Sequence, residues 1–123
     1  MQQHRPRFLL VLATAAIAVL ALAGAAQAST TRAAATTTQV KAGEFFFKLS
    51  SKSLAKPGKV TFVVKNVGKV DHDFKIDGKR TALLKPGATA KLVVTFKKAG
   101  KYQYLCTVFG HAAAGMEGTF TVR

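Results

Sequence analysis

Three residues that can bind a metal recur at five-residue steps near the C-terminal end of the chain: Cys106, His111 and Met116. The chain has only one cysteine, and His72 is the one other histidine outside the N-terminal segment. A thiolate, two imidazoles and a thioether make a soft ligand set, which suits an ion that cycles between Cu(I) and Cu(II). The four residues therefore predict a site for one copper ion, trigonal through two histidines and a cysteine, with the methionine as a weak axial ligand.

The spacing lets a single loop supply three of the four ligands. Gly110 and Gly115 stand between them and allow the turns that aim the side chains. Each residue alone has a more ordinary explanation, because a histidine is often a satisfied polar group, a cysteine a small apolar one and a methionine a core filler. Their joint occurrence in one pattern favours the metal site.

The segments that must position these ligands have the texture of an all-β sandwich or barrel. From residue 39 onward, short runs rich in Val, Phe, Thr and Tyr alternate with Gly, Pro-Gly and Asp-Gly. The alanines at 112–114 favour no more than one helical turn, since glycines enclose them. We expect strands at about 38–41, 44–50, 59–66, 72–77, 81–83, 90–97, 101–106 and 118–122.

Alternation along these strands predicts that two of the ligands point inward, because every second side chain of a strand shares a face. Cys106 has the parity of Tyr104, and His72 has the parity of Phe74. Asp73 has the opposite parity and is expected on the outer face. The strand ends at 72 and 106 should therefore bring distant ligands together at one end of the sandwich.

The N-terminal segment has the composition of a secretory signal. Arg5 and Arg7 precede an apolar run over residues 8–23, and Ala26-Gln27-Ala28 provides small residues for cleavage. We predict a signal peptide at 1–28, a flexible Thr/Ala-rich tether at 29–38 and one domain at 39–123, and expect an exported protein, periplasmic or extracellular. An uncleaved membrane anchor is the alternative, since the apolar run approaches membrane-spanning length.

The remaining chain is strongly basic. Without Arg5 and Arg7, the formal net charge of +14 falls to about +12. Such a charge favours acidic partner proteins or peripheral contact with an anionic membrane surface. The lysines are spaced singly along the expected strands, with no arginine-rich arm and no recognised nucleic-acid motif, so no nucleic-acid partner is expected. A single small domain of this kind is expected to be a monomer.

The loop CTVFGHAAAGMEG and the distant DHDF resemble the cupredoxin family, the type 1 blue copper proteins of plastocyanin and azurin type. The resemblance covers about residues 39–123 and implies a Greek-key sandwich of about seven or eight strands. It matches His72 to the first histidine ligand, Cys106 to the thiolate, His111 to the second histidine and Met116 to the axial ligand. It also implies that His111 presents a ring edge within an apolar patch, where a redox partner docks.

Two residues depart from the family pattern. Asp73 stands where the family often has Asn, an amide that ties the ligand loops together, and a carboxylate can accept but not donate in that bond. Phe109 stands where the family often has Pro before the loop histidine. This replacement predicts either a less rigid loop or an exposed Phe109.

These residues predict a non-enzymatic carrier of single electrons, and they leave copper storage or delivery open, since that function would use the same ligands. A copper oxidase or a nitrite reductase needs additional histidine-bound copper, and both histidines of the expected domain are already assigned. A metal-free β-sandwich for adhesion or binding is the remaining alternative, and it predicts no colour on addition of Cu(II).

Overall fold

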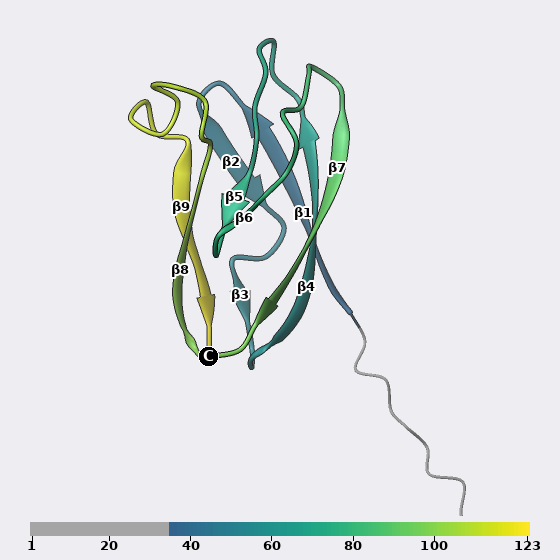
Figure 1. Ribbon diagram of the computed structural model, residues 1–123, viewed down its shortest axis with the longest axis vertical. Coiled ribbons are helices and arrows are strands. Elements are labelled where there is room, and N and C mark those ends of the chain that lie inside the picture. Colours follow the sequence, from purple (N-terminus) through teal and green to yellow (C-terminus); the bar gives the residue numbers. More distant parts are fainter. Residues whose placement is uncertain (1–34) are drawn as a thin grey trace, which may run out of the picture. The chain divides into compact units, whose positions relative to one another are not determined.

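Nine strands in two facing sheets form the part of the chain described by this computed structural model, residues 35–123. The four-stranded sheet has the order β2-β1-β4-β7 and the five-stranded sheet the order β3-β9-β8-β5-β6 (Figure 1). The strands are β1 (Thr36–Gly43), β2 (Phe46–Leu49), β3 (Ser53–Leu54), β4 (Gly58–Asn66), β5 (Lys75–Ile76), β6 (Lys79–Arg80), β7 (Thr89–Phe96), β8 (Gly100–Leu105) and β9 (Glu117–Val122).

Both sheets are mixed, and the chain passes repeatedly from one to the other, as expected for a Greek-key sandwich. β1 runs parallel to β4 and β3 runs parallel to β9, while the remaining pairs are antiparallel. Within residues 35–123, no helix is long and apolar enough to cross a membrane. The predicted all-β sandwich is confirmed.

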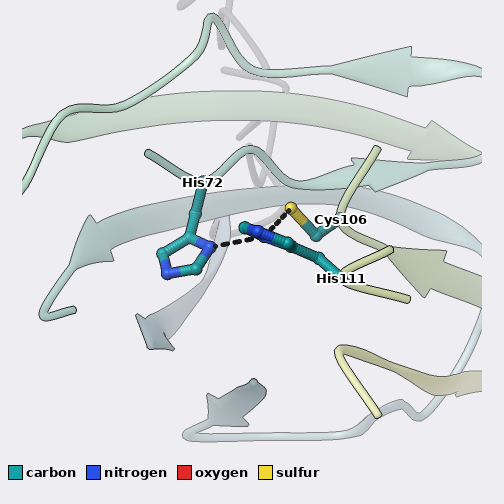
Figure 2. Close-up of side chains that lie close together, drawn as sticks. All are labelled: His72, Cys106 and His111. Carbon is teal, nitrogen blue, oxygen red and sulfur yellow. Dashed lines mark hydrogen bonds between the residues drawn. The ribbon is translucent and has the colours of Figure 1, made fainter. Parts of the chain in front are cut away.

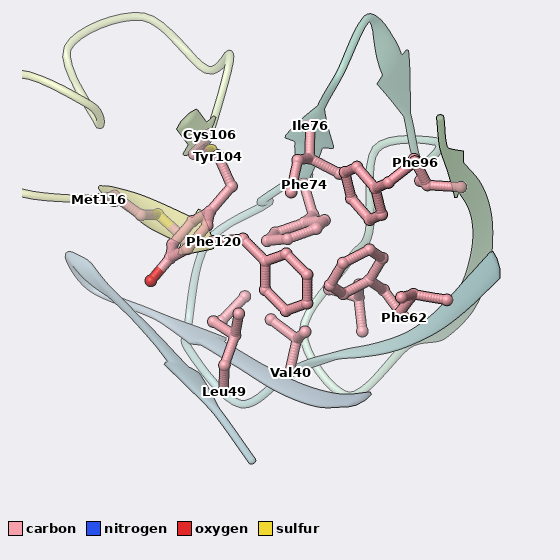
Figure 3. Close-up of a cluster of buried hydrophobic side chains, with 14 of the residues drawn as sticks. Val40, Leu49, Phe62, Phe74, Ile76, Phe96, Tyr104, Cys106, Met116 and Phe120 are labelled. Atoms are coloured by element: carbon pink, nitrogen blue, oxygen red, sulfur yellow. The ribbon is translucent and has the colours of Figure 1, made fainter. Parts of the chain in front are cut away.

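The core lies between the sheets and is rich in aromatic rings (Figure 3). Phe62 of β4 is fully buried, and its ring centroid lies 5.3 Å from that of Phe74 and 5.3 Å from that of Phe120. Phe96 of β7 stacks on Phe120 at 5.4 Å. These rings join the two sheets near the strands that lead into the ligand residues, so core packing holds the framework of the site.

Two of the predicted strands differ from the structure. The strand expected at 72–77 is shortened to β5, and His72 forms an isolated bridge with Leu84 instead. The strand expected at 81–83 is wrong, because β5 pairs with β6 at residues 79–80 through a tight turn. Asp77 and Gly78 at this turn have positive φ angles of 48° and 73°, as a two-residue hairpin requires.

The N-terminal boundary also differs from the expectation. The first strand begins at Thr36, where it pairs with Val60 of β4, so the last residues of the predicted tether belong to the sheet. Thr38 is fully buried there. The predicted signal peptide at 1–28 and the rest of the predicted tether lie outside the described residues. The two-residue strand β3 was not predicted, because two residues are too few to show alternation.

Candidate metal centre

The predicted ligands come from two connections at one end of the sandwich (Figure 1). Cys106 follows directly after β8, and His111 and Met116 lie in the loop that joins β8 to β9. His72 lies in the connection between β4 and β5. As parity predicted, His72 and Cys106 are inward, with exposed fractions of 0% and 1%.

The histidine and cysteine side chains converge on one point (Figure 2). The Nδ1 atoms of His72 and His111 are 3.2 Å apart, and the Cys106 Sγ lies 3.6 Å from His111 Nδ1. The ligand atoms of all three residues lie within 4.8 Å of one another. Nitrogens bound to one metal ion at about 2.0 Å in tetrahedral directions lie roughly 3.3 Å apart, and such a nitrogen and a thiolate sulfur lie roughly 3.5 Å apart. The three side chains therefore fit around a single ion.

Met116 lies beside this group and is fully buried. Its N–H donates to the carbonyl of His111 at 3.1 Å, and its carbonyl accepts from the N–H of Cys106 at 3.1 Å. These bonds tie the beginning, middle and end of the ligand loop together, and the Met116 side chain enters the core near Cys106 (Figure 3). Its role as the axial ligand remains a prediction.

His72 is held both through its backbone and through one nitrogen of its ring. Its backbone exchanges hydrogen bonds with Leu84, at 3.0 and 2.7 Å, and its Nε2 lies 2.9 Å from Oε1 of Glu44. The N–H groups of Val70 and Lys69 also donate to this oxygen and, with the His72 ring, lower the pKa of the Glu44 carboxyl to about 2. An ionised carboxylate only accepts, so Nε2 is the donor and the lone pair of His72 is on Nδ1, toward the other ligands.

Asp73 ties the two ligand segments together. Its Oδ1 accepts from the N–H of Thr107 at 2.6 Å, its Oδ2 accepts from the Thr107 hydroxyl, and the Arg80 Nε lies 3.8 Å away. The expectation from parity that Asp73 faces outward is wrong, since the residue is 4% exposed. β5 begins only at Lys75, so Asp73 precedes the strand and alternation does not apply to it. The Asp73 carboxylate only has to accept in this contact, because the N–H and the hydroxyl of Thr107 are both donors.

Cys106 is shielded from water in the same region. Burial raises the pKa of the Cys106 thiol, and hydrogen bonding to backbone groups opposes this only in part. A metal must therefore displace a proton from the thiol when it binds, so that binding is coupled to proton release.

His111 is the most accessible of the three converging ligands, and one apolar ring packs against it. Phe45 packs edge-on against the imidazole with ring centroids 4.9 Å apart. Phe109 is fully exposed, at 100%, which confirms the second of the two outcomes expected from the missing proline. His111 N–H donates to the carbonyl of Val108 at 3.0 Å, so the loop folds back on itself and leaves Phe109 at its tip.

Sequence reasoning missed the contribution of the β1–β2 turn. Glu44 and Phe45 were assigned to a strand, but the chain turns there, and each residue contacts one of the two histidines. The only signal in the sequence was that Glu44 is one of just 5 acidic residues in a chain with 19 lysines and arginines. Asn66 was likewise missed, although it is fully buried and bonded to the loop that leads to His72.

Comparison with known proteins gives one family. A family model described as a cupredoxin-like domain matches residues 12–122. The chain is 35% identical to a copper-resistant cuproprotein CopI of Vibrio cholerae serotype O1, over 46% of each chain. It is 31% identical to the protein of the same name from Rubrivivax gelatinosus, over 52% of each chain. The chain thus spans about half the length of the curated relatives it matches.

Solved structures share the fold. Auracyanin of Roseiflexus castenholzii superposes with a TM-score of 0.65 at 21% identity, covering 72% of this chain and 98% of that one. Auracyanin A of Chloroflexus aurantiacus, described as a blue copper protein, has a TM-score of 0.59 at 22% identity, with the same coverage. A multicopper oxidase also matches, at 14% identity and a TM-score of 0.59, but this chain covers only 44% of it.

Proposed function

This chain belongs to the cupredoxin-like domain family, whose cofactor is copper, and from that premise we propose that it is an exported type 1 copper protein that carries single electrons between redox partners. The observation that carries the proposal is the convergence of one buried thiol and two imidazole nitrogens within 4.8 Å. In this proposal His72, Cys106 and His111 hold the ion and Met116 is its axial ligand. A bound copper ion supplies a one-electron couple between Cu(I) and Cu(II).

The protein contributes a ligand set that resists rearrangement. His72 is held by Leu84 and Glu44, and the segment that begins at Cys106 is held by Asp73 through Thr107. A site whose ligands keep their places in both oxidation states loses little energy to reorganisation when an electron arrives or leaves. This rigidity supports electron transfer over catalysis, so we propose no enzymatic activity.

The surroundings of His111 support a docking role for this end of the molecule. The imidazole is half-buried, and the exposed ring of Phe109 and the partly exposed rings of Phe45 and Phe46 lie on neighbouring segments. An apolar surface of this kind allows a partner to approach the ligand ring closely. We expect an acidic redox partner to dock near His111, because the basic chain attracts acidic surfaces and raises the rate of association at low salt.

The net charge and the N-terminal segment also suggest where the protein acts. The proposal places the protein outside the cytoplasm, as a monomer, in the periplasm or the extracellular space, where its lysines also allow peripheral contact with anionic membranes. It includes no nucleic-acid partner.

Copper storage or delivery is the second candidate, and the names of the relatives favour it. The matched proteins are described as copper-resistant cuproproteins. In that role copper would be cargo, and the same ligands would have to release it. The buried Cys106, at 1% exposure, supports slow release and hence the carrier.

A pair of rate measurements separates these functions. The copper-loaded protein is mixed, in one experiment, with a small one-electron oxidant or reductant and, in another, with a Cu(I) chelator of known affinity. The carrier predicts complete reversible electron exchange in a time during which the chelator removes almost no copper. Rapid copper transfer together with slow electron exchange would contradict the carrier and support delivery.

A further inference from the structure

Glu44 stands out because one carboxylate oxygen gathers three hydrogen bonds at the edge of the metal centre. Its Oε1 accepts from the N–H of Lys69 at 2.7 Å, the N–H of Val70 at 3.0 Å and the Nε2 of His72 at 2.9 Å. Glu44 lies in the β1–β2 turn, far along the sequence from the residues that bind it. This one side chain therefore joins the first turn of the domain to the ligand segment at 69–72.

The local packing is built around this carboxylate. A side chain at Gly68 would overlap the carboxylate, so only a glycine leaves room for it there. The Glu44 side chain is 30% exposed while the His72 side chain is fully buried, so water reaches the carboxylate but not the ring that it contacts. Among residues 35–123, the bond to Glu44 is the only polar contact that the structure shows for the Nε2 atom of His72.

Two physical consequences follow for a metal bound at Nδ1. An acceptor at Nε2 fixes the ring orientation and keeps the proton off Nδ1, which is the general effect of a carboxylate behind a metal-binding histidine. A full negative charge at this position also makes the imidazole a stronger electron donor and stabilises Cu(II) more than Cu(I), since Cu(II) carries the larger positive charge.

We propose that Glu44 is a positioning residue of the copper site that aims His72 Nδ1 at the ion and lowers the reduction potential through its hydrogen bond to Nε2. This inference rests on the proposed copper function for its effect on the potential. Its effect on the ring of His72 concerns the chain alone and holds without metal.

Glu44→Gln separates charge from hydrogen bonding. The amide of glutamine keeps an oxygen that can accept the same three bonds, but it removes the negative charge. Changes in groups that support a metal ligand weaken metal binding by about 10- to 100-fold. We expect a loss of Cu(II) affinity about tenfold larger than that of Cu(I) affinity, which corresponds to a rise in potential of about 59 mV.

Asp71→Asn is the matched control. Asp71 is next to His72 in sequence, and its replacement by asparagine removes the same charge as Glu44→Gln. The Asp71 carboxylate, however, lies 3.7 Å from the Lys85 ammonium and makes no bond to the imidazole. The inference predicts a much smaller shift for this variant. Equal shifts in the two variants would overturn it, because they would show a general effect of charge, and so would an unchanged potential in Glu44→Gln.

Imidazole nitrogen-15 spectra of the copper-free protein test the orientation separately. At a pH where His72 is neutral, the wild-type protein and Glu44→Gln should both show the Nε2–H form. Glu44→Ala, which has no acceptor, should show a mixture of the two forms, with circular dichroism confirming the fold. An unchanged spectrum in Glu44→Ala would refute the orienting role. If the wild-type protein formed no copper–thiolate centre at all, the proposed function would fail, while these spectra would still decide whether Glu44 orients His72.

Discussion

Replacing Asn66 with alanine is expected to destabilise the domain strongly, although this residue binds no metal. Asn66 is fully buried at the end of β4. Its side-chain amide donates to the carbonyls of Val70 at 2.8 Å and Leu84 at 2.7 Å, and its Oδ1 accepts from the N–H of Gly68 at 2.9 Å. Leu84 is also the bridge partner of His72, so these bonds hold in place the backbone that positions His72.

The size of the effect follows from the number of bonds. A hydrogen bond contributes about 1 kcal/mol to stability, so the loss of three bonds lowers the free energy of unfolding by about 3 kcal/mol. In a domain of this size each kcal/mol shifts the melting temperature by about 4–8 °C, so we expect a decrease of at least roughly 12 °C. Thermal unfolding followed by circular dichroism, with urea titration to obtain the free energy, measures both quantities.

Two further variants make the interpretation specific. Asn66→Asp keeps the acceptor for Gly68 but places a buried carboxylate against two carbonyl oxygens, so it should be at least as destabilising as alanine. Thr119→Ala, on the exposed side of β9, should change stability by less than about 0.5 kcal/mol. If Asn66→Ala changed stability no more than Thr119→Ala, the reasoning from buried hydrogen bonds would be refuted.

Further predictions concern other contacts. Thr107→Val removes the hydroxyl that donates to Asp73 and should lower stability by about 1.5–3 kcal/mol in a urea titration, since bonds to charged groups are stronger. Gly118→Ala places a methyl group against the ring of Tyr104, its cross-strand partner, and should cost about 1–3 kcal/mol by the same assay. The Glu44 carboxyl has a pKa of about 2 in the fold and 4.5 ordinarily, so it stabilises the copper-free protein above pH 4.5, and this contribution is lost as the pH falls toward 2. Acid titration of Glu44→Gln should therefore show a shallower loss of stability in this range than the wild-type protein.

Much of the architecture could be predicted from local pattern. The longer strands alternate clearly between apolar and polar residues, so β4, β7, β8 and β9 were placed to within a residue or two. The same alternation turned Cys106 inward. His72 is also inward as expected, but it precedes β5 and is buried together with Asp73, so alternation does not account for it. The positions of the longer strands are decided by burial against one core, and burial is what a two-residue period reports.

The remaining parts depend on contacts between distant segments. Glu44 and Asn66 owe their roles to backbone groups at 68–70 and 84, which the sequence does not place beside them. Asp73 was assigned to the wrong face because β5 begins only after it, at Lys75, and its carboxylate binds Thr107. Short pairings such as β5 with β6 were misplaced for a related reason, since a turn rather than alternation determines their register.

The most direct test of the central claim is the visible absorption of the purified protein during titration with Cu(II). A copper–thiolate centre predicts an intense charge-transfer band that saturates at one copper per chain and that is absent in Cys106→Ser. Circular dichroism of both proteins confirms that they are folded. A folded wild-type protein without the band, or a band that survives in Cys106→Ser, would contradict a copper centre built on Cys106, His72 and His111.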